Sequence, residues 1–189
     1  MDLVFEEFYR SIPRHGEEVC GDNVEVIKKE NKTIIVLSDG LGSGIKANIL
    51  STLTSKIASG LLDKELPLKE ILSTILATLP VCEIRGIAYA TLAFLIVDQN
   101  KNMHLIEIDS PSAFLFRDGE VKKLDYRSFE LEGKTVREAN FKFRRNDQLF
   151  LVSDGVTHAG IGGLLNFGLG WEGVAEEIKR VVNNNGNNL

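Results

Sequence analysis

The sequence has little of what marks secreted, membrane or nucleic-acid-binding proteins. It contains two cysteines, Cys20 and Cys82, no signal peptide and no apolar run long enough to span a bilayer. We therefore expect reduced thiols, a cytoplasmic location and no membrane partner. The net charge is -5 and no basic stripe is visible, which argues against a nucleic-acid partner.

Histidine is also scarce, with one residue each at His15, His104 and His158. No two of them have the spacing of helical zinc ligands, so we expect no zinc site. His158 follows a Ser-Asp-Gly sequence and is a candidate for lining a cleft, although a local structural role fits it as well. Cys20 begins no Cys-x5-Arg phosphate loop, and we expect it to be a packed thiol.

Two apolar stretches of the sequence end in the same three residues: "TIIVLSDG" at residues 33–40 and "QLFLVSDG" at residues 148–155. In each copy an apolar run leads into Ser-Asp-Gly. A carboxylate just past a buried strand has a rigid base, and the glycine lets the backbone turn sharply or bring its carbonyl close to a ligand. Asp-Gly is also a common turn sequence, so one copy alone favours a turn. The two matching copies leave a turn and a site equally open.

The spacing of apolar residues predicts the first strands and helices. Strands are expected at residues 3–9, 24–29 and 33–37, the last two forming a hairpin through Asn31 and Lys32. Helices are expected at residues 43–62, after Pro67, and at residues 171–182. The predicted inner faces are Ile45, Ile49, Leu53, Ile57 and Leu61 in the first helix; Leu68, Ile71, Leu72, Ile75 and Leu79 in the second; and Val174, Ile178 and Val181 in the third.

From residue 88 the chain returns to strand patterns, including "YATLAFLIVD", "MHLIEID" and "SAFLFRDGEVKKL". In the last of these, Asp118 and Gly119 are a strong hairpin signal. Strands, two helices, many antiparallel strands and a closing helix give an α+β order. We predict two mainly antiparallel sheets packed face to face with helices outside. At 189 residues, 43% of them hydrophobic, the chain is expected to form one globular domain, residues 1–189.

In such a sandwich, residues at the ends of facing strands project into a shared cleft. Asp39 and Asp154 close the two repeated stretches, and Asp22, in "CGDN", precedes the strand that pairs with residues 33–37. Three carboxylates at one rim repel each other unless cations neutralise them, and ligand sets made of oxygen favour magnesium, calcium or manganese. The sequence therefore predicts a site for hard divalent cations.

The glycine-rich run at residues 40–44 has two interpretations. Before a helix it could hold a phosphate, as in dinucleotide-binding folds, with Asp63 near the expected spacing. Asp63, however, follows a predicted helix and not a strand. The second interpretation is that the glycines let the chain leave the strand and enter the helix, with Ser43 as its cap.

Five motifs give the chain a family resemblance: "GEEVCGDN", "IIVLSDGLGSGIKANI", "RGIAYATLAFLIVD", "IDSPSAFLFRDGEV" and "LFLVSDGVTHAG". Together they resemble the metal-dependent serine/threonine protein phosphatases of the PPM (type 2C) class, closest to the bacterial SpoIIE and RsbX branch. The resemblance covers nearly the whole chain in the family's order. It implies an α-β-β-α sandwich that hydrolyses phosphoserine or phosphothreonine in a phosphorylated protein, of the stressosome or anti-sigma antagonist type.

The resemblance also implies a two-metal centre with manganese or magnesium. In it Asp39 would bridge both metals, the carbonyl of Gly40 would complete one site, Asp154 would bind the other metal, and Asp22 would hold a metal or its water. These residues are the three carboxylates that strand patterns alone select, together with the adjacent glycine.

The chain departs from the family at its end. The family closes with an Asp-Asp or Asp-Asn strand that gives the last metal carboxylate, and no aspartate follows Asp154 here. Either the natural protein continues past Leu189 with this strand, which the given chain then lacks, or the chain ends here and its second metal site is weak. A catalytically weak pseudophosphatase or regulatory binding module is therefore the alternative function, with nucleotide binding through residues 40–44 a weaker one. The sequence does not indicate an oligomeric state.

Overall fold

In the computed structural model the chain divides into two compact units. Unit 1 comprises Met1–Ser110 and Tyr126–Lys142, and unit 2 comprises Pro111–Asp125 and Phe143–Leu189. The structure describes residues 4–64, 66–78, 81–82, 87–88, 90–161 and 166–186. No helix within these ranges is both long and apolar enough to cross a membrane.

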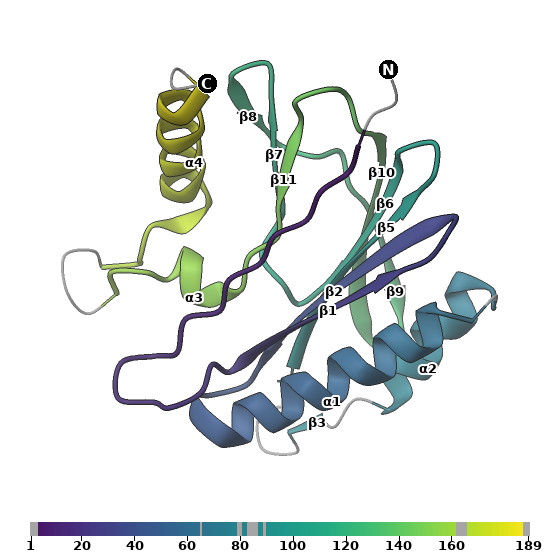
Figure 1. Ribbon diagram of the computed structural model, residues 1–189. Coiled ribbons are helices and arrows are strands. Elements are labelled where there is room, and N and C mark those ends of the chain that lie inside the picture. The colour runs from purple at the N-terminus through teal and green to yellow at the C-terminus, as the bar shows by residue number, and fades with distance from the viewer. Residues whose placement is uncertain are drawn as a thin grey trace. The chain divides into compact units, whose positions relative to one another are not determined.

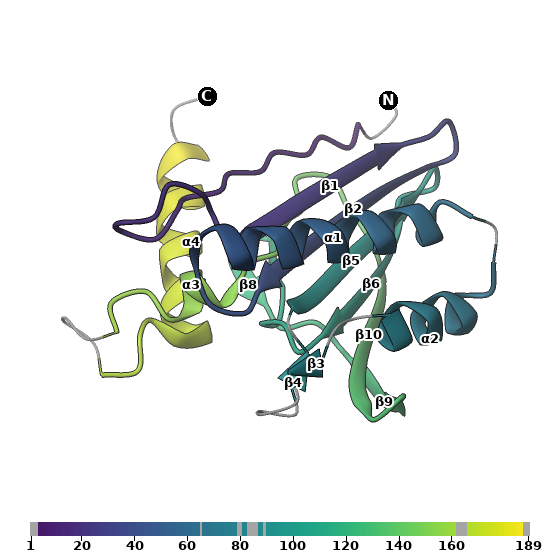
Figure 2. The same cartoon turned by 90° about the horizontal axis from the view of Figure 1, so that it is seen from below.

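Unit 1 is built on a six-stranded antiparallel sheet with the strand order β1-β2-β5-β6-β10-β9 (Figure 1). Two helices, α1 and α2, lie against one face of it (Figure 2). A short β3-β4 ribbon completes the described elements of the unit. The bounds are β1 Asp22–Lys28, β2 Lys32–Gly40, α1 Gly44–Leu62, α2 Leu68–Thr78, β3 Val81–Cys82, β4 Ile87–Ala88, β5 Ala90–Asp98, β6 Asn102–Ile108, β9 Arg127–Leu131 and β10 Lys134–Lys142.

The predicted β1-β2 hairpin is confirmed. All seven residues of β1 pair with β2, from Asp22 opposite Asp39 to Lys28 opposite Thr33. Ile34 and Val36 of β2 are fully buried and face the helices, where they join the main hydrophobic core. The alternation of buried and half-buried residues along β2 is the period of two that the sequence shows.

The predicted strand at residues 3–9 is wrong. Residues 4–9 form no strand, and Leu3 lies outside the described residues. The side chains of Val4, Phe8 and Tyr9 are exposed. The apolar alternation here therefore does not mark one buried face, which is what strand prediction assumes.

Helix α1 confirms the predicted helix but only part of its predicted inner face, since Leu61 packs against the core. Ile45, Ile49 and Leu53 are at least half exposed. The buried face consists mostly of small residues: Gly44, Ala47, Ser51, Thr54, Ser55, Ala58, Ser59 and Leu62. Three of its buried hydroxyl groups are satisfied within the helix, because the serines donate to carbonyls three residues earlier. Small side chains allow the helix to approach the sheet closely. The helix therefore turns its small residues to the sheet and leaves Ile45, Ile49 and Leu53 exposed.

Helix α2 agrees better with its pattern. The backbone carbonyl of Pro67 accepts hydrogen bonds at the start of the helix, as a proline-initiated helix predicts. Ile71, Leu72 and Ile75 are buried and Leu68 packs against them. Leu79, the last predicted member of this face, lies outside the described residues.

A buried carboxylate lies inside unit 1, on β6. Glu107 is fully buried, and its side chain accepts a hydrogen bond from the hydroxyl of Tyr126 at 2.9 Å and forms an ion pair with Arg137 at 2.9 Å. Arg137 also donates to the carbonyl of Ser110 and lies over the Tyr126 ring. The network therefore joins the two positions, Ser110 and Tyr126, at which the chain leaves unit 1 and returns to it.

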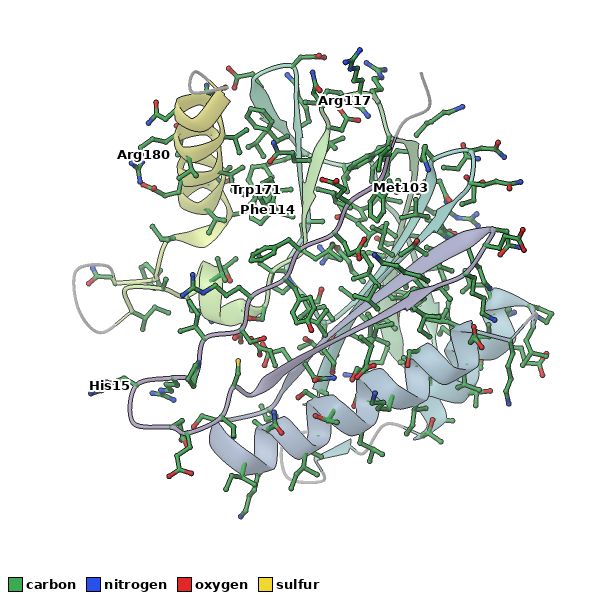
Figure 3. The ribbon with its side chains drawn as sticks, in the orientation of Figure 1. His15, Met103, Phe114, Arg117, Trp171 and Arg180 are labelled. Atoms are coloured by element: carbon green, nitrogen blue, oxygen red, sulfur yellow. The ribbon has the colours of Figure 1, made fainter. Side chains whose placement is uncertain are left out.

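In its described residues, unit 2 contains a three-stranded antiparallel sheet of order β11-β7-β8 and two helices. Its elements are β7 Phe114–Arg117, β8 Glu120–Lys122, β11 Gln148–Phe150, α3 Asp154–Thr157 and α4 Gly170–Gly186. Asp118 and Gly119 have positive φ and connect β7 to β8, which confirms the predicted hairpin. Phe114 stacks on Trp171 of α4 with ring centroids 4.9 Å apart (Figure 3).

Two predictions in unit 2 need correction. The strand expected from "QLFLVSDG" ends at Phe150, and the chain then runs without regular structure to a single helical turn that begins at Asp154. On α4, Val174 is buried and Ile178 packs against the core, but Val181 is 47% exposed. The next residue, Val182, is half-buried instead, so periodicity alone assigned Val181 wrongly.

An ion pair fixes the turn before β11 to β7. The carboxylate of Asp147 accepts hydrogen bonds from Arg117 at 2.9 and 2.6 Å and from the backbone N–H of Arg144 at 2.6 Å. The Asp147 side chain is only 2% exposed. Its burial opposes ionisation, but the hydrogen bonds and charges of Arg117 and Arg144 hold the pKa of this carboxyl below its usual range.

We predict that Asp147→Asn lowers the free energy of unfolding by about 3 kcal/mol near neutral pH, because it leaves the Arg117 charge without its partner. The wild-type contribution should be complete above about pH 5 and should be lost as pH falls through the lowered pKa of the folded protein. Urea unfolding across this pH range measures it. Asp125→Asn, at an exposed position in the same unit, is the matched control. A deficit that stayed constant down to about pH 2 would contradict the role of the charge.

Candidate metal centre

The candidate site in unit 1 lies at one end of the β1-β2 hairpin. Asp22 is the first residue of β1, Asp39 is the last but one of β2, and the two are direct partners in the ladder. This confirms the expectation that they lie at the same end of the hairpin. Both residues are half-buried.

The pair lies on the sheet face opposite to α1 and α2. Alternate residues of β2 point to opposite faces, and Ile34, Val36 and Ser38 are the buried ones. Asp39 therefore shares its face with Ile35 and Leu37. Like charges directly opposite each other on one face destabilise a sheet, so this position favours a bound cation.

Gly40 follows Asp39, and its need for glycine has a different origin from the one predicted. Its φ is not in the left-handed region that favours glycine. A Cβ at this position would lie 2.0 Å from the backbone carbonyl oxygen of Ala47 in α1. The Gly40 N–H donates to the carbonyl of Gly21 at 3.2 Å. Glycine is thus required because helix α1 crosses directly over the end of β2.

The loop between β2 and α1 favours the helix-entry interpretation over a phosphate loop. Gly42 and Gly44 have positive φ, which lets the chain turn into the helix. Ser43 lies at the predicted N-cap position with extended backbone, but its side chain makes no capping hydrogen bond. Its hydroxyl instead donates to Glu17 at 2.8 Å. Asp63, the residue that a dinucleotide site would need, forms an ion pair with Lys29 at the far end of α1.

Asp154 lies in unit 2, as the first residue of α3. Its side chain is 58% exposed. Ser153 precedes it with extended backbone and is buried, and the hydroxyl of Thr157 donates to the Asp154 carbonyl at 3.1 Å. The structure thus brings Asp22 and Asp39 together in unit 1 and presents Asp154 at the surface of unit 2.

His158, which the sequence also singled out, lies close to Asp154. Its Nδ1 lies 3.7 Å from a carboxylate oxygen of Asp154, and its side chain is 58% exposed. The spacing of four residues that brings them together is visible in the sequence. A single helical turn after a strand-like pattern is hard to recognise, however, so the spacing alone does not identify this pair.

Cys20 has the environment of a packed thiol and not of a nucleophile. Partial burial and then the charge of Asp22 raise the pKa of its thiol, so the thiolate is disfavoured. The sulfur lies 3.5 Å from the carbonyl of Ile12 and 3.5 Å from the backbone N–H of Asp22. His15 is exposed in the preceding loop (Figure 3).

The donors at the hairpin end suit a hard cation. Two carboxylates beside a backbone carbonyl are the oxygen ligands that magnesium and manganese prefer. Within the described ranges, no group of three or more His, Cys, Asp or Glu residues is placed to hold a metal ion. Unit 1 therefore contributes a pair of carboxylates, and the metal roles of Asp22, Asp39, Gly40 and Asp154 remain predictions.

Sequence reasoning missed Glu17 and Asn48. Glu17 contacts Ser43, and the Asn48 side chain donates to the carbonyl of Cys20 at 2.8 Å. Both contacts connect the segment before β1 to the start of α1. Their partners are 26 and 28 residues apart, so no local pattern could have identified them.

Comparison with known proteins supports the resemblance. The family model for Stage II sporulation protein E (SpoIIE) matches residues 29–185. Curated protein sequences give no match. The PP2C phosphatase domain of the cell fate determinant SpoIIE from Bacillus subtilis, solved with a fragment of its regulatory domain, has a TM-score of 0.72 and 22% identity. The match covers 90% of this chain and 48% of that one, so this chain spans about half the length of that structure.

Two further structures show the same fold. RsbX in complex with magnesium has a TM-score of 0.61 and 18% identity, over 90% of this chain and 84% of that chain. A chain from a study of the bacterial stressosome has a TM-score of 0.61 and 18% identity, over 93% and 89%. These likenesses confirm the predicted α+β fold class. Because the family model spans most of the sequence, the chain belongs to the Stage II sporulation protein E (SpoIIE) family.

Proposed function

We propose that this chain is a metal-dependent protein serine/threonine phosphatase that hydrolyses phosphoserine or phosphothreonine on a bacterial signalling protein. The observation that carries the proposal is the direct pairing of Asp22 with Asp39 at the end of the hairpin. In a member of the SpoIIE family, two facing carboxylates next to a glycine carbonyl match the donors that a phosphatase metal centre requires.

Each residue has a proposed role at this centre. Asp39 would bridge two manganese or magnesium ions, Gly40 would contribute its carbonyl oxygen, and Asp22 would hold a metal or its water. Asp154, from unit 2, would bind the second ion. Such ions supply a hydroxide at neutral pH and offset the charge of the phosphoryl oxygens. The chain's own contribution is to hold the two hairpin carboxylates on rigid, paired strands.

The proposed substrate is a phosphorylated protein of the stressosome or anti-sigma antagonist type. One of the structures that this chain resembles comes from a study of the bacterial stressosome, and another is a cell fate determinant. Their fold is shared here at low identity, so the substrate class is a proposal for this chain.

One observation favours a second candidate, a pseudophosphatase that keeps the fold but turns over slowly. The described residues contain no group of three or more potential metal ligands. A weak second metal site would lower turnover and leave a binding function. Phosphate release from a phosphorylated partner domain, with and without manganese, separates the two candidates.

We predict that phosphate release requires manganese or magnesium and stops when the ion is chelated, because oxygen ligands of this kind serve hard cations. The assay adds chelator and then restores activity with an excess of either ion. Zinc is the comparison, since the donor set lacks the nitrogen and sulfur ligands that structural zinc sites use. Undiminished release after exhaustive removal of metal would overturn the proposed mechanism.

We predict that Asp39→Asn lowers turnover by about 100-fold or more, because it removes the bridging charge while keeping the side-chain volume. The metal-free variant should be at least as stable as the wild type in urea, since like charges opposite each other on a sheet are unfavourable. Asp125→Asn, which removes the same charge at an exposed position, should keep wild-type turnover. Wild-type turnover in Asp39→Asn would exclude the bridge.

A further inference from the structure

A segment before β1 lies beside the start of α1, next to the carboxylate pair. We call residues 14–21 the strap; it leads into β1 close to the first turn of α1 (Figures 1 and 2). Three hydrogen bonds attach the strap to the end of β2 and the start of α1. They run from Ser43 to Glu17 at 2.8 Å, from Asn48 to the Cys20 carbonyl at 2.8 Å, and from the Gly40 N–H to the Gly21 carbonyl at 3.2 Å.

The Glu17 carboxylate is the charged contact among the three. Gly44, the first residue of α1, has φ +68°, and a Cβ on it would lie 2.2 Å from the second carboxylate oxygen of Glu17. The chain therefore uses a glycine in a left-handed conformation where the carboxylate of Glu17 approaches. Glu17 is half-buried, whereas the adjacent Glu18 is exposed.

Helix α1 lacks the usual features of a stable N-terminus. It has no acidic residue in its first turn, and Ser43 makes no capping hydrogen bond. The carboxylate of Glu17 lies at this end of the helix, where a negative charge is favourable. Because Gly40 touches the backbone of Ala47, a shift of the first turn of α1 would also move the end of β2.

We propose that Glu17 is a positioning residue for the metal centre, which acts through Ser43. By holding the loop at residues 41–44, it fixes the first turn of α1 against Gly40, and so fixes the Asp39 carboxylate and the Gly40 carbonyl. The inference rests on the proposed function for its cation. The contact itself belongs to the metal-free structure and can be tested without any cation.

The main test is a double-mutant cycle on manganese affinity, measured by titration calorimetry with the full chain. Glu17→Ala and Ser43→Ala should each weaken the first manganese site about 10-fold, the range for residues that orient metal ligands. The double variant should be no weaker than either single variant, because both remove the same hydrogen bond. Glu17→Gln keeps the acceptor oxygen and should recover affinity to within about threefold of the wild type.

The control Glu18→Gln removes a charge one residue away and should leave affinity unchanged. A double variant about 100-fold weaker would show independent effects and overturn the proposal, as would a Glu17→Gln variant as weak as Glu17→Ala, which would make Glu17 a metal ligand. Single variants with wild-type affinity would overturn it too.

Hydrogen exchange of the metal-free protein separates this proposal from the proposed function. Amides of residues 40–47 should exchange faster in Glu17→Ala and Ser43→Ala than in the wild type or Glu18→Gln, while those of α2 stay unchanged. If wild-type chain binds no manganese, the proposed function fails, and the exchange pattern still decides whether Glu17 orders the loop. Unchanged exchange at residues 40–47 would overturn the positioning role.

Discussion

The register of the β1-β2 hairpin is the constraint on which the candidate site depends. Asp22 faces Asp39 only because the two strands pair without a slip over seven positions. A slip of one residue would place Asp39 opposite a different residue and turn one strand's side chains to the other face. The packing of Ile27 of β1 against the core that buries Ile34 and Val36 of β2 opposes such a slip. Core packing thus fixes the carboxylates that face away from that core.

Sequence periodicity predicted the elements better than their faces. The strands that form the site, the β7-β8 hairpin and three of the helices follow from apolar spacing and turn residues, because these signals are local. The buried face of α1 does not, since Ala47, Ser51 and Ala58 allow a close approach to the sheet while Ile45 and Ile49 remain exposed. Hydrophobicity alone predicts that the isoleucines are buried and the small residues exposed. That prediction fails where the close fit of helix against sheet decides which residues are buried.

The site was predictable to the extent that it is encoded in strand ends. The predicted hairpin placed Asp22 beside Asp39, the carboxylate of the first Ser-Asp-Gly. The two copies of Ser-Asp-Gly, however, have different local structures. At Asp39 the strand continues to Gly40, whereas at Asp154 it has ended and a helical turn begins. Strand pairing makes the difference, because β2 is paired with β5 as far as Gly40 while the pairing of β11 with β7 ends at Phe150. Those partner strands are distant in the sequence, so a local motif cannot predict where the pairing stops.

Glycine connects the hairpin to its helix at three positions. Side chains at Gly40 and Gly44 would collide with Ala47 and Glu17, and one at Gly21 would press on the Ala47 side chain at 3.2 Å. Glycines cost conformational entropy on folding, so their concentration here trades stability for a close approach of strand, helix and strap. Since Ala47 is fully buried against two of them, the first turn of α1 has little freedom to move without the end of β2. The geometry of the carboxylate pair is therefore a property of the helix start as much as of the hairpin.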